Sequence, residues 1–243
     1  MMDGTGAGAP RTVGILGGMG PGATILLMQK VIAAVPAVDD SDHVPLLVDQ
    51  NPQVPSRIKR LIDGEGEDPG PVLAMMARRL EGAGAEALAM PCNTAHHYAG
   101  AIRGAASVRF LDMVALSVAH ARHLAGEGGT VGILASPAVR RVGLFDAPMA
   151  EAGLTPLYAA DEEATLAVIR SVKTDGPTAA SRQSLRAASE ELLGRGAGVQ
   201  MVACTEFSLI ADAVAEGATA FDTLDRLVRA IVAFSLEPAT AHA

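Results

Sequence analysis

The feature that most constrains the fold of this chain is a repeated apolar pentapeptide. The sequence TVGIL occurs at residues 12–16 and again at residues 130–134. A chance identical match of five residues is expected in only about a few per cent of chains this long. Buried parallel strands use few residue types, however, and can converge on the same sequence. The repeat therefore indicates two related halves only if a second match supports it.

A second match surrounds the two cysteines of the chain. The segment LEGAGAEALAMPCNT contains Cys92, and LLGRGAGVQMVACTE contains Cys204. Aligning the two cysteines also pairs a leucine, two glycines and an alanine, namely Leu80 with Leu192, Gly82 with Gly194, Gly84 with Gly196, and Ala85 with Ala197. Two matches in the same order favour an internal duplication.

Short apolar runs alternate with segments of helical spacing along the whole chain, which predicts an α/β fold with mostly parallel sheets flanked by helices. The predicted helices include 71–81, 161–173 and 178–193, and the predicted strands are 12–16, 44–49, 86–91, 108–112, 130–134, 154–159, 199–204 and 218–222. The functional crevice of such sheets lies beyond the carboxyl ends of the strands. Two facing halves would thus place Cys92 and Cys204 on opposite walls of one interdomain cleft.

Composition argues against several classes of protein. The net charge is −8, aromatic residues make up 3%, and tryptophan is absent, whereas nucleic-acid binders usually show a basic face. No apolar run has the length of a membrane span. The first ten residues, MMDGTGAGAP, are typical of a flexible tail and not of a signal peptide, so we expect a cytoplasmic protein. Two cysteines are too few for a disulfide scaffold.

Five motifs together resemble the aspartate racemase family, part of the Asp/Glu racemase superfamily. They are GILGGMGPGAT (14–24), NPQVPSR (51–57), GEDPGP (66–71), MPCNTAH (90–96) and ACTE (203–206). The resemblance implies a homodimer and activity on a small amino acid or dicarboxylate without pyridoxal phosphate or another cofactor. It also implies two domains related by a pseudo-twofold axis. We expect the first to comprise 11–112 plus a returning segment, 218–239, and the second to comprise 113–217.

The chain departs from the family pattern at several positions on the substrate side. Ser56 and Ile58 stand where the family often has aspartate and threonine, and Ala203 stands where it often has glycine. The residues 136–139, SPAV, replace a loop that is commonly rich in threonine and glycine. These changes affect the assignment to aspartate more than the assignment to racemisation.

Cys92 and Cys204 are the candidate catalytic residues, although free cysteines are often only buried core residues. Each follows an apolar strand and precedes a polar pair at a helix start, where backbone N–H groups lower the pKa of a thiol. One would begin turnover as thiolate and the other as thiol. A zinc site of Cys92, His96 and Cys204 is the alternative, but a zinc-bound thiolate is a poor exchangeable base, so we expect no metal. His96 would instead orient the first turn, or simply pack.

The glycine-rich loop after the first TVGIL does not fit the dinucleotide-binding pattern G-x-G-x-x-G. We expect it to bring backbone N–H groups to a substrate carboxylate, with Met19 lining the cleft.

Polar residues near these motifs are the candidate substrate ligands. Arg57 can bind a carboxylate with two parallel hydrogen bonds, and Lys173 corresponds to a substrate-binding lysine of the family. Solvated surface charges are the alternative for both. Glu206 would support the helix start or orient Cys204. The uncharged candidates are Asn51, Asn93, Thr94 and Thr205.

The sequence thus predicts a cofactor-independent racemase of aspartate, with glutamate second. A hydantoin racemase or a maleate isomerase uses similarly placed cysteines and stays open. A non-catalytic protein that binds an acidic metabolite is the alternative from another class.

Overall fold

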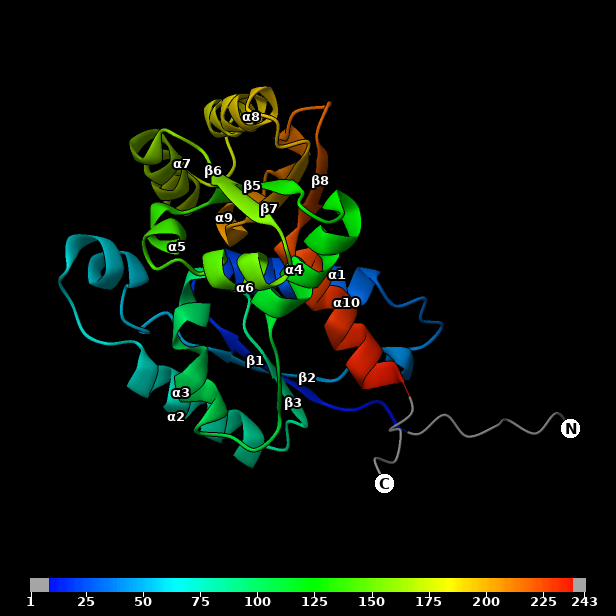
Figure 1. Cartoon of the computed structure of the whole chain (residues 1–243). Coiled ribbons are helices and arrows are strands. Elements are labelled where there is room, and N and C mark those ends of the chain that lie inside the picture. The colour runs from blue at the N-terminus through cyan, green and yellow to red at the C-terminus, as the bar shows by residue number, and fades with distance from the viewer. Residues whose placement is uncertain (1–8, 238–243) are drawn as a thin grey trace, which may run out of the picture.

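The protein folds around two sheets, which the computed structural model shows for residues 9–237 (Figure 1). Both sheets have four strands, and all the strand pairs are parallel. The first has the order β2-β1-β3-β4, made of Leu46–Gln50, Val13–Gly17, Ala87–Ala89 and Arg109–Leu111. The second has the order β6-β5-β7-β8, made of Thr155–Tyr158, Thr130–Ala135, Val199–Ala203 and Thr219–Asp222. The predicted α/β class is confirmed, and each predicted strand overlaps an observed one.

The two sheets repeat one strand order, with β5 in the place of β1 and β7 in the place of β3. The glycine of each TVGIL is needed for the same reason. A Cβ atom on Gly14 would lie 2.9 Å from Cβ of Ala85 and 3.0 Å from Cβ of Leu80. On Gly132 it would lie 3.2 Å from both Ala197 and Leu192, the residues that the cysteine alignment pairs with Ala85 and Leu80. The repeated glycines therefore let a helix and its following turn pack closely on a central strand.

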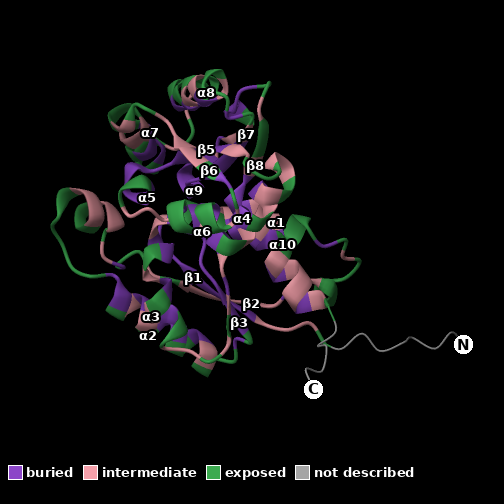
Figure 2. Cartoon of the chain, in the orientation of Figure 1, coloured by how far each residue is buried: buried purple, intermediate pink, exposed green. Residues whose placement is uncertain are grey.

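Helices cover both faces of each sheet, and buried residues concentrate on the central strands β1, β3, β5 and β7 and on the helix faces that meet the sheets (Figure 2). On the first sheet, α1 (Pro21–Ala33) and α10 (Thr223–Leu236) pack on one face, and α2 (Gly70–Gly82) and α3 (Ala99–Arg103) on the other. On the second sheet, α7 (Glu162–Asp175) and α8 (Ala179–Gly194) lie opposite α4 (Met113–Ala125) and α6 (Asp146–Glu151). Two short helices, α5 (Pro137–Arg141) and α9 (Thr205–Ser208), follow β5 and β7. The three predicted helices correspond to α2, α7 and α8.

Two helices cross between the halves at equivalent points. After β4 of the first sheet, Asp112 caps α4, which packs Val114 and Val118 on the second sheet. After β8 of the second sheet, Asp222 caps α10, which packs on the first sheet. Figure 1 shows α4 and α10 side by side between the sheets.

This crossing changes one expected boundary. The segment 218–239 was expected to return to the first domain, but β8 pairs with β7 of the second sheet, and the return begins with α10. The reason is that the apolar strand ATAFD extends the second sheet before the chain crosses. The division of the chain into two domains stays a prediction.

Within residues 9–237, no helix is both long and apolar enough to cross a bilayer. The predicted N-terminal tail, residues 1–10, falls almost entirely outside the described range, as do residues 238–243.

Candidate active site

The two cysteines occupy related positions at the carboxyl ends of β3 and β7. Cys92 lies three residues beyond β3, and Cys204 directly follows β7. Both side chains are buried, with 6% of each residue exposed. They line a single small pocket of about 40 Å³ together with Met19, Ser56, Arg57, Ile58, Thr94, Ser136, Ile169, Lys173 and Glu206. The pocket therefore receives residues from both halves of the chain.

Cys204 belongs to a short chain of polar contacts. Its Sγ donates to Oε2 of Glu206 at 3.1 Å, and Nζ of Lys173 lies 3.3 Å from Oε1 of the same carboxylate. Burial and the negative charge of Glu206 raise the pKa of the Cys204 thiol well above its usual value, and Lys173 offsets this only in part. The backbone N–H of Glu206 at the helix start does act to lower this pKa, as expected, but the net shift is upward. The helix α9 has a single turn, and burial together with the adjacent carboxylate outweighs its backbone contribution.

His96 is held as a neutral ring behind Cys92. Its Nε2 accepts a hydrogen bond from the backbone N–H of Met113 at 3.2 Å, so Nδ1 carries the proton and donates to the carbonyl oxygen of Cys92 at 2.8 Å. Burial lowers the pKa of His96, which favours the same neutral form. Both ring nitrogens are thus engaged with the backbone, which disfavours the zinc alternative. His96 instead ties the Cys92 segment to the start of α4.

Arg57 and Lys173 bring positive charge to the pocket from opposite halves. Nη1 of Arg57 donates to the carbonyl oxygens of Val54 and Pro55 at 3.3 and 3.0 Å. These hydrogen bonds hold the guanidinium group against its own loop. The charge of Lys173 is shared with Glu206, whereas no carboxylate within residues 9–237 pairs with Arg57.

Thr94 joins the two halves across the pocket. Its Oγ1 lies 3.2 Å from Oγ of Ser136, which lies between β5 and α5. Ser136 is buried, and its hydroxyl therefore has a defined position at the wall of the pocket.

Three of the predicted substrate ligands are not part of this lining. Asn51 accepts a hydrogen bond from the backbone of Gln53 at 3.0 Å. Asn93 is buried and donates to Oγ1 of Thr223 at 3.0 Å, and this hydroxyl donates in turn to the carbonyl oxygen of Val202 in β7. Thr205 lines an adjoining cavity of about 100 Å³, which shares Lys173 and Glu206 with the cysteine pocket.

The glycine-rich loop has a structural role at its first turn. Gly18 adopts a φ of +92°, and a Cβ there would lie 2.7 Å from the backbone nitrogen of Asn51. Its N–H donates to Oγ1 of Thr24 at 3.0 Å, so it is not free to bind a carboxylate as expected. Met19 does line the pocket, as the sequence predicted.

Sequence reasoning did not select Ser136 or Ile169 as site residues. The duplication could have identified Ser136, because Ser136 follows β5 in the same way that the glycine-rich loop follows β1. Ile169 lies one helical turn before Lys173 on α7, so both side chains share a face.

A sequence profile described as Asp/Glu/Hydantoin racemase matches residues 16–231, nearly the whole chain. The chain belongs to this family. Over 124 residues it is 32% identical to the broad specificity amino-acid racemase RacX of Bacillus subtilis, covering 49% of this chain and 53% of that relative. The match thus spans about half the length of RacX.

Solved structures of similar fold include the aspartate racemase of Picrophilus torridus, with a TM-score of 0.80 and 24% identity over 91% of this chain and 93% of that chain. Another is the glutamate racemase of Francisella tularensis in complex with D-glutamate, with a TM-score of 0.65 and 13% identity over 92% of this chain and 80% of that chain. At these identities the likeness shows that this family member shares their fold.

Proposed function

We propose that this protein is a cofactor-independent amino-acid racemase that interconverts L- and D-aspartate, with glutamate as the second substrate. The observation that carries the proposal is the pair of cysteines at equivalent strand ends, lining one pocket. Racemisation removes a proton from one face of a carbon and delivers a proton to the other, so two related thiols suit it.

In the mechanism that we propose, the thiolate of Cys92 takes the α-proton of one enantiomer while the thiol of Cys204 gives its proton to the opposite face. The configuration at the α-carbon is inverted, and Cys92 is then a thiol and Cys204 a thiolate. The reverse reaction restores both starting protonation states. The raised pKa of Cys204 supports its role as the acid in the free protein. Glu206, hydrogen-bonded to that thiol, is in position to act on it as a base.

The uncompensated charge of Arg57 supports recognition of a second carboxylate. Lys173 would contribute when a substrate carboxylate competes with Glu206 for it. Thr94 and Ser136 supply hydroxyl groups to the same substrate.

A wider substrate range is the second candidate. Met19, Ile58 and Ile169 give the pocket an apolar part, which favours side chains without charge. The similarity to the broad specificity racemase RacX supports the same candidate.

A substrate panel separates these candidates. Chiral chromatography would follow both enantiomers of aspartate, glutamate, alanine and leucine, with hydantoins and maleate as further compounds. We expect the highest kcat/KM with aspartate. Equal rates with alanine would favour the broad enzyme, turnover of hydantoin or maleate alone would move the protein to those activities, and no turnover at all would favour a metabolite-binding protein. We further propose a cytoplasmic homodimer, which sedimentation analysis would test.

A further inference from the structure

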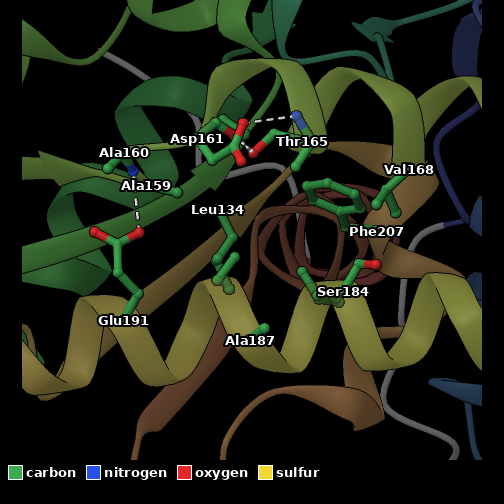
Figure 3. A pocket seen from close by; sticks show the side chains of 14 residues that line it. Leu134, Ala159, Ala160, Asp161, Thr165, Val168, Ser184, Ala187, Glu191 and Phe207 are labelled. Carbon is green, nitrogen blue, oxygen red and sulfur yellow. Dashed lines mark hydrogen bonds between the residues drawn. The ribbon is translucent and has the colours of Figure 1, made fainter.

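A cavity of about 350 Å³ lies between α7 and α8, separate from the much smaller cysteine pocket (Figure 3). Its floor is Leu134 of β5, and Phe207 of α9 and Val168 of α7 form apolar walls. These three side chains are buried, whereas the outer part of the cavity is open to solvent beside exposed residues of both helices. The volume lies in the range of small-molecule sites.

The cavity exists because the facing positions on the two helices carry small side chains. Ala164 on α7 and both Ala187 and Ala188 on α8 line it. Larger residues at these positions would fill the space, as close packing normally does in protein interiors. The sequence therefore keeps an apolar hollow open beside the core of the second half.

The polar groups at this cavity select the charge of a ligand. The two acidic side chains are Asp161 and Glu191, and the lining contains no lysine, arginine or histidine. Glu191 is already engaged by the backbone N–H of Ala160 at 3.0 Å and by Arg195. Oδ1 of Asp161 caps α7 at Ala164, but no cation in the described part of the chain pairs with this carboxylate. An anion would be repelled here, and a cation would find one uncompensated charge.

We propose that this cavity is a binding site for a small apolar amine, with its apolar part against Leu134, Val168 and Phe207 and its ammonium group at Asp161. A cavity of about 350 Å³ has the volume of about a dozen water molecules, so it fits a ligand of about a dozen non-hydrogen atoms. The proposal does not depend on racemase activity. It is also distinct from substrate binding, because Arg57 and Lys173 give the cysteine pocket the opposite preference.

Isothermal titration calorimetry with three probes that share one apolar body tests the charge preference. Phenylbutylamine should bind the wild-type protein, phenylbutanol should bind about threefold more weakly, as expected for the loss of an exposed ion pair, and phenylbutyrate should not bind measurably. The Asp161→Asn variant keeps the capping oxygen and should remove the difference between amine and alcohol. Asp175→Asn, at the other end of the same helix, changes the net charge equally and should leave the difference intact.

The location is tested by filling the cavity. Ala164→Leu places a larger side chain in it and should weaken phenylbutylamine at least tenfold, and Ala187→Leu on the facing helix should do the same. Ala167→Leu is the matched control, because Ala167 is an exposed residue of α7 outside the lining. Unchanged binding in both filled variants would overturn the proposal, as would equal binding of amine and butyrate. A change of oligomeric state in Ala164→Leu and not in Ala167→Leu would show that a second copy covers the cavity, which would also overturn it.

Discussion

Cys92 and Cys204 have related backbone positions but different surroundings. The carbonyl oxygen of Cys92 is fixed by a neutral histidine, whereas the Sγ of Cys204 donates to a carboxylate. Burial and Glu206 raise the pKa of Cys204, which favours the protonated form of this thiol. In the mechanism that we propose, this protonated thiol is the acid for one direction of racemisation.

Replacing either cysteine by serine tests the paired roles. Cys92→Ser and Cys204→Ser should each reduce interconversion by at least about a hundredfold, because serine is a far weaker acid and cannot replace thiol acid–base catalysis. Each variant keeps a base on one face only, so in deuterated solvent one should exchange the α-proton of the L-enantiomer and the other that of the D-enantiomer. Racemisation by either variant at close to the wild-type rate would refute the mechanism.

Arg57 is the residue on which recognition of a second carboxylate depends. Arg57→Ala should reduce kcat/KM for aspartate by a factor equivalent to about 1.5–3 kcal/mol, the cost of a lost charge-assisted hydrogen bond. The kcat/KM for alanine should change much less. Arg57→Lys should recover part of the loss. The control is Arg60→Ala, because Arg60 donates to Gly66 in the same loop and lies outside the pocket lining. An equal loss for aspartate and alanine would indicate a structural role for Arg57.

At the scale of elements, the crossing helices α4 and α10 begin in the same way but with carboxylates of opposite behaviour. Burial raises the pKa of Asp222 to about 6. Burial also acts to raise the pKa of Asp112, but hydrogen bonds from Ala115 and Arg103 help to lower it overall. Two related caps therefore respond differently to pH.

The free energy of unfolding should reveal this difference. Between the unfolded pKa of 3.8 and the folded pKa of about 6, the folded protein binds more protons at Asp222, so its contribution to stability is lost as pH rises through that range. The contribution is about 3 kcal/mol for a shift of about two units. Asp222→Asn keeps an acceptor for Leu224 and should gain stability relative to wild type by up to that amount between pH 4 and 7 in urea titrations.

Asp112→Asn is the matched variant at the other crossing. The lowered pKa of Asp112 gives a stabilisation that is present above pH 3.8 and is lost as pH falls through the folded pKa. This variant should therefore differ from wild type in the opposite direction, with the difference shrinking in acid. Parallel pH profiles for Asp222→Asn and wild type would contradict the assignment at Asp222.

At the scale of the whole molecule, both halves of the chain contribute side chains to the pocket. The chemistry that we propose uses these side chains and no cofactor. We expect protein dialysed against a chelator, and assayed without pyridoxal phosphate, to keep its full rate of aspartate racemisation. The rate is followed by chiral chromatography, and zinc is added back as the control. Activity that disappears with the chelator and returns with zinc would support a metal at Cys92 despite the engaged nitrogens of His96.

The sequence by itself determined the repeated unit, because close packing at Gly14 and Gly132 requires the same small and apolar neighbours in both halves. It also predicted that MPCNTAH and ACTE carry the chemistry, and each of these motifs does lie at the end of a strand. Only the tertiary structure decided which side chains meet. Asn51 and Asn93 belong to the right motifs, but Oδ1 of Asn51 accepts from Gln53, Nδ2 of Asn93 donates to Thr223, and neither side chain lines the cysteine pocket. The pKa of Cys204 is shifted up, opposite to expectation, because it depends on burial and on Glu206. The sequence pattern contains neither the distances between side chains nor their exposure to solvent. The hollow beside α7 arises from alanines on two helices that meet only in the folded protein.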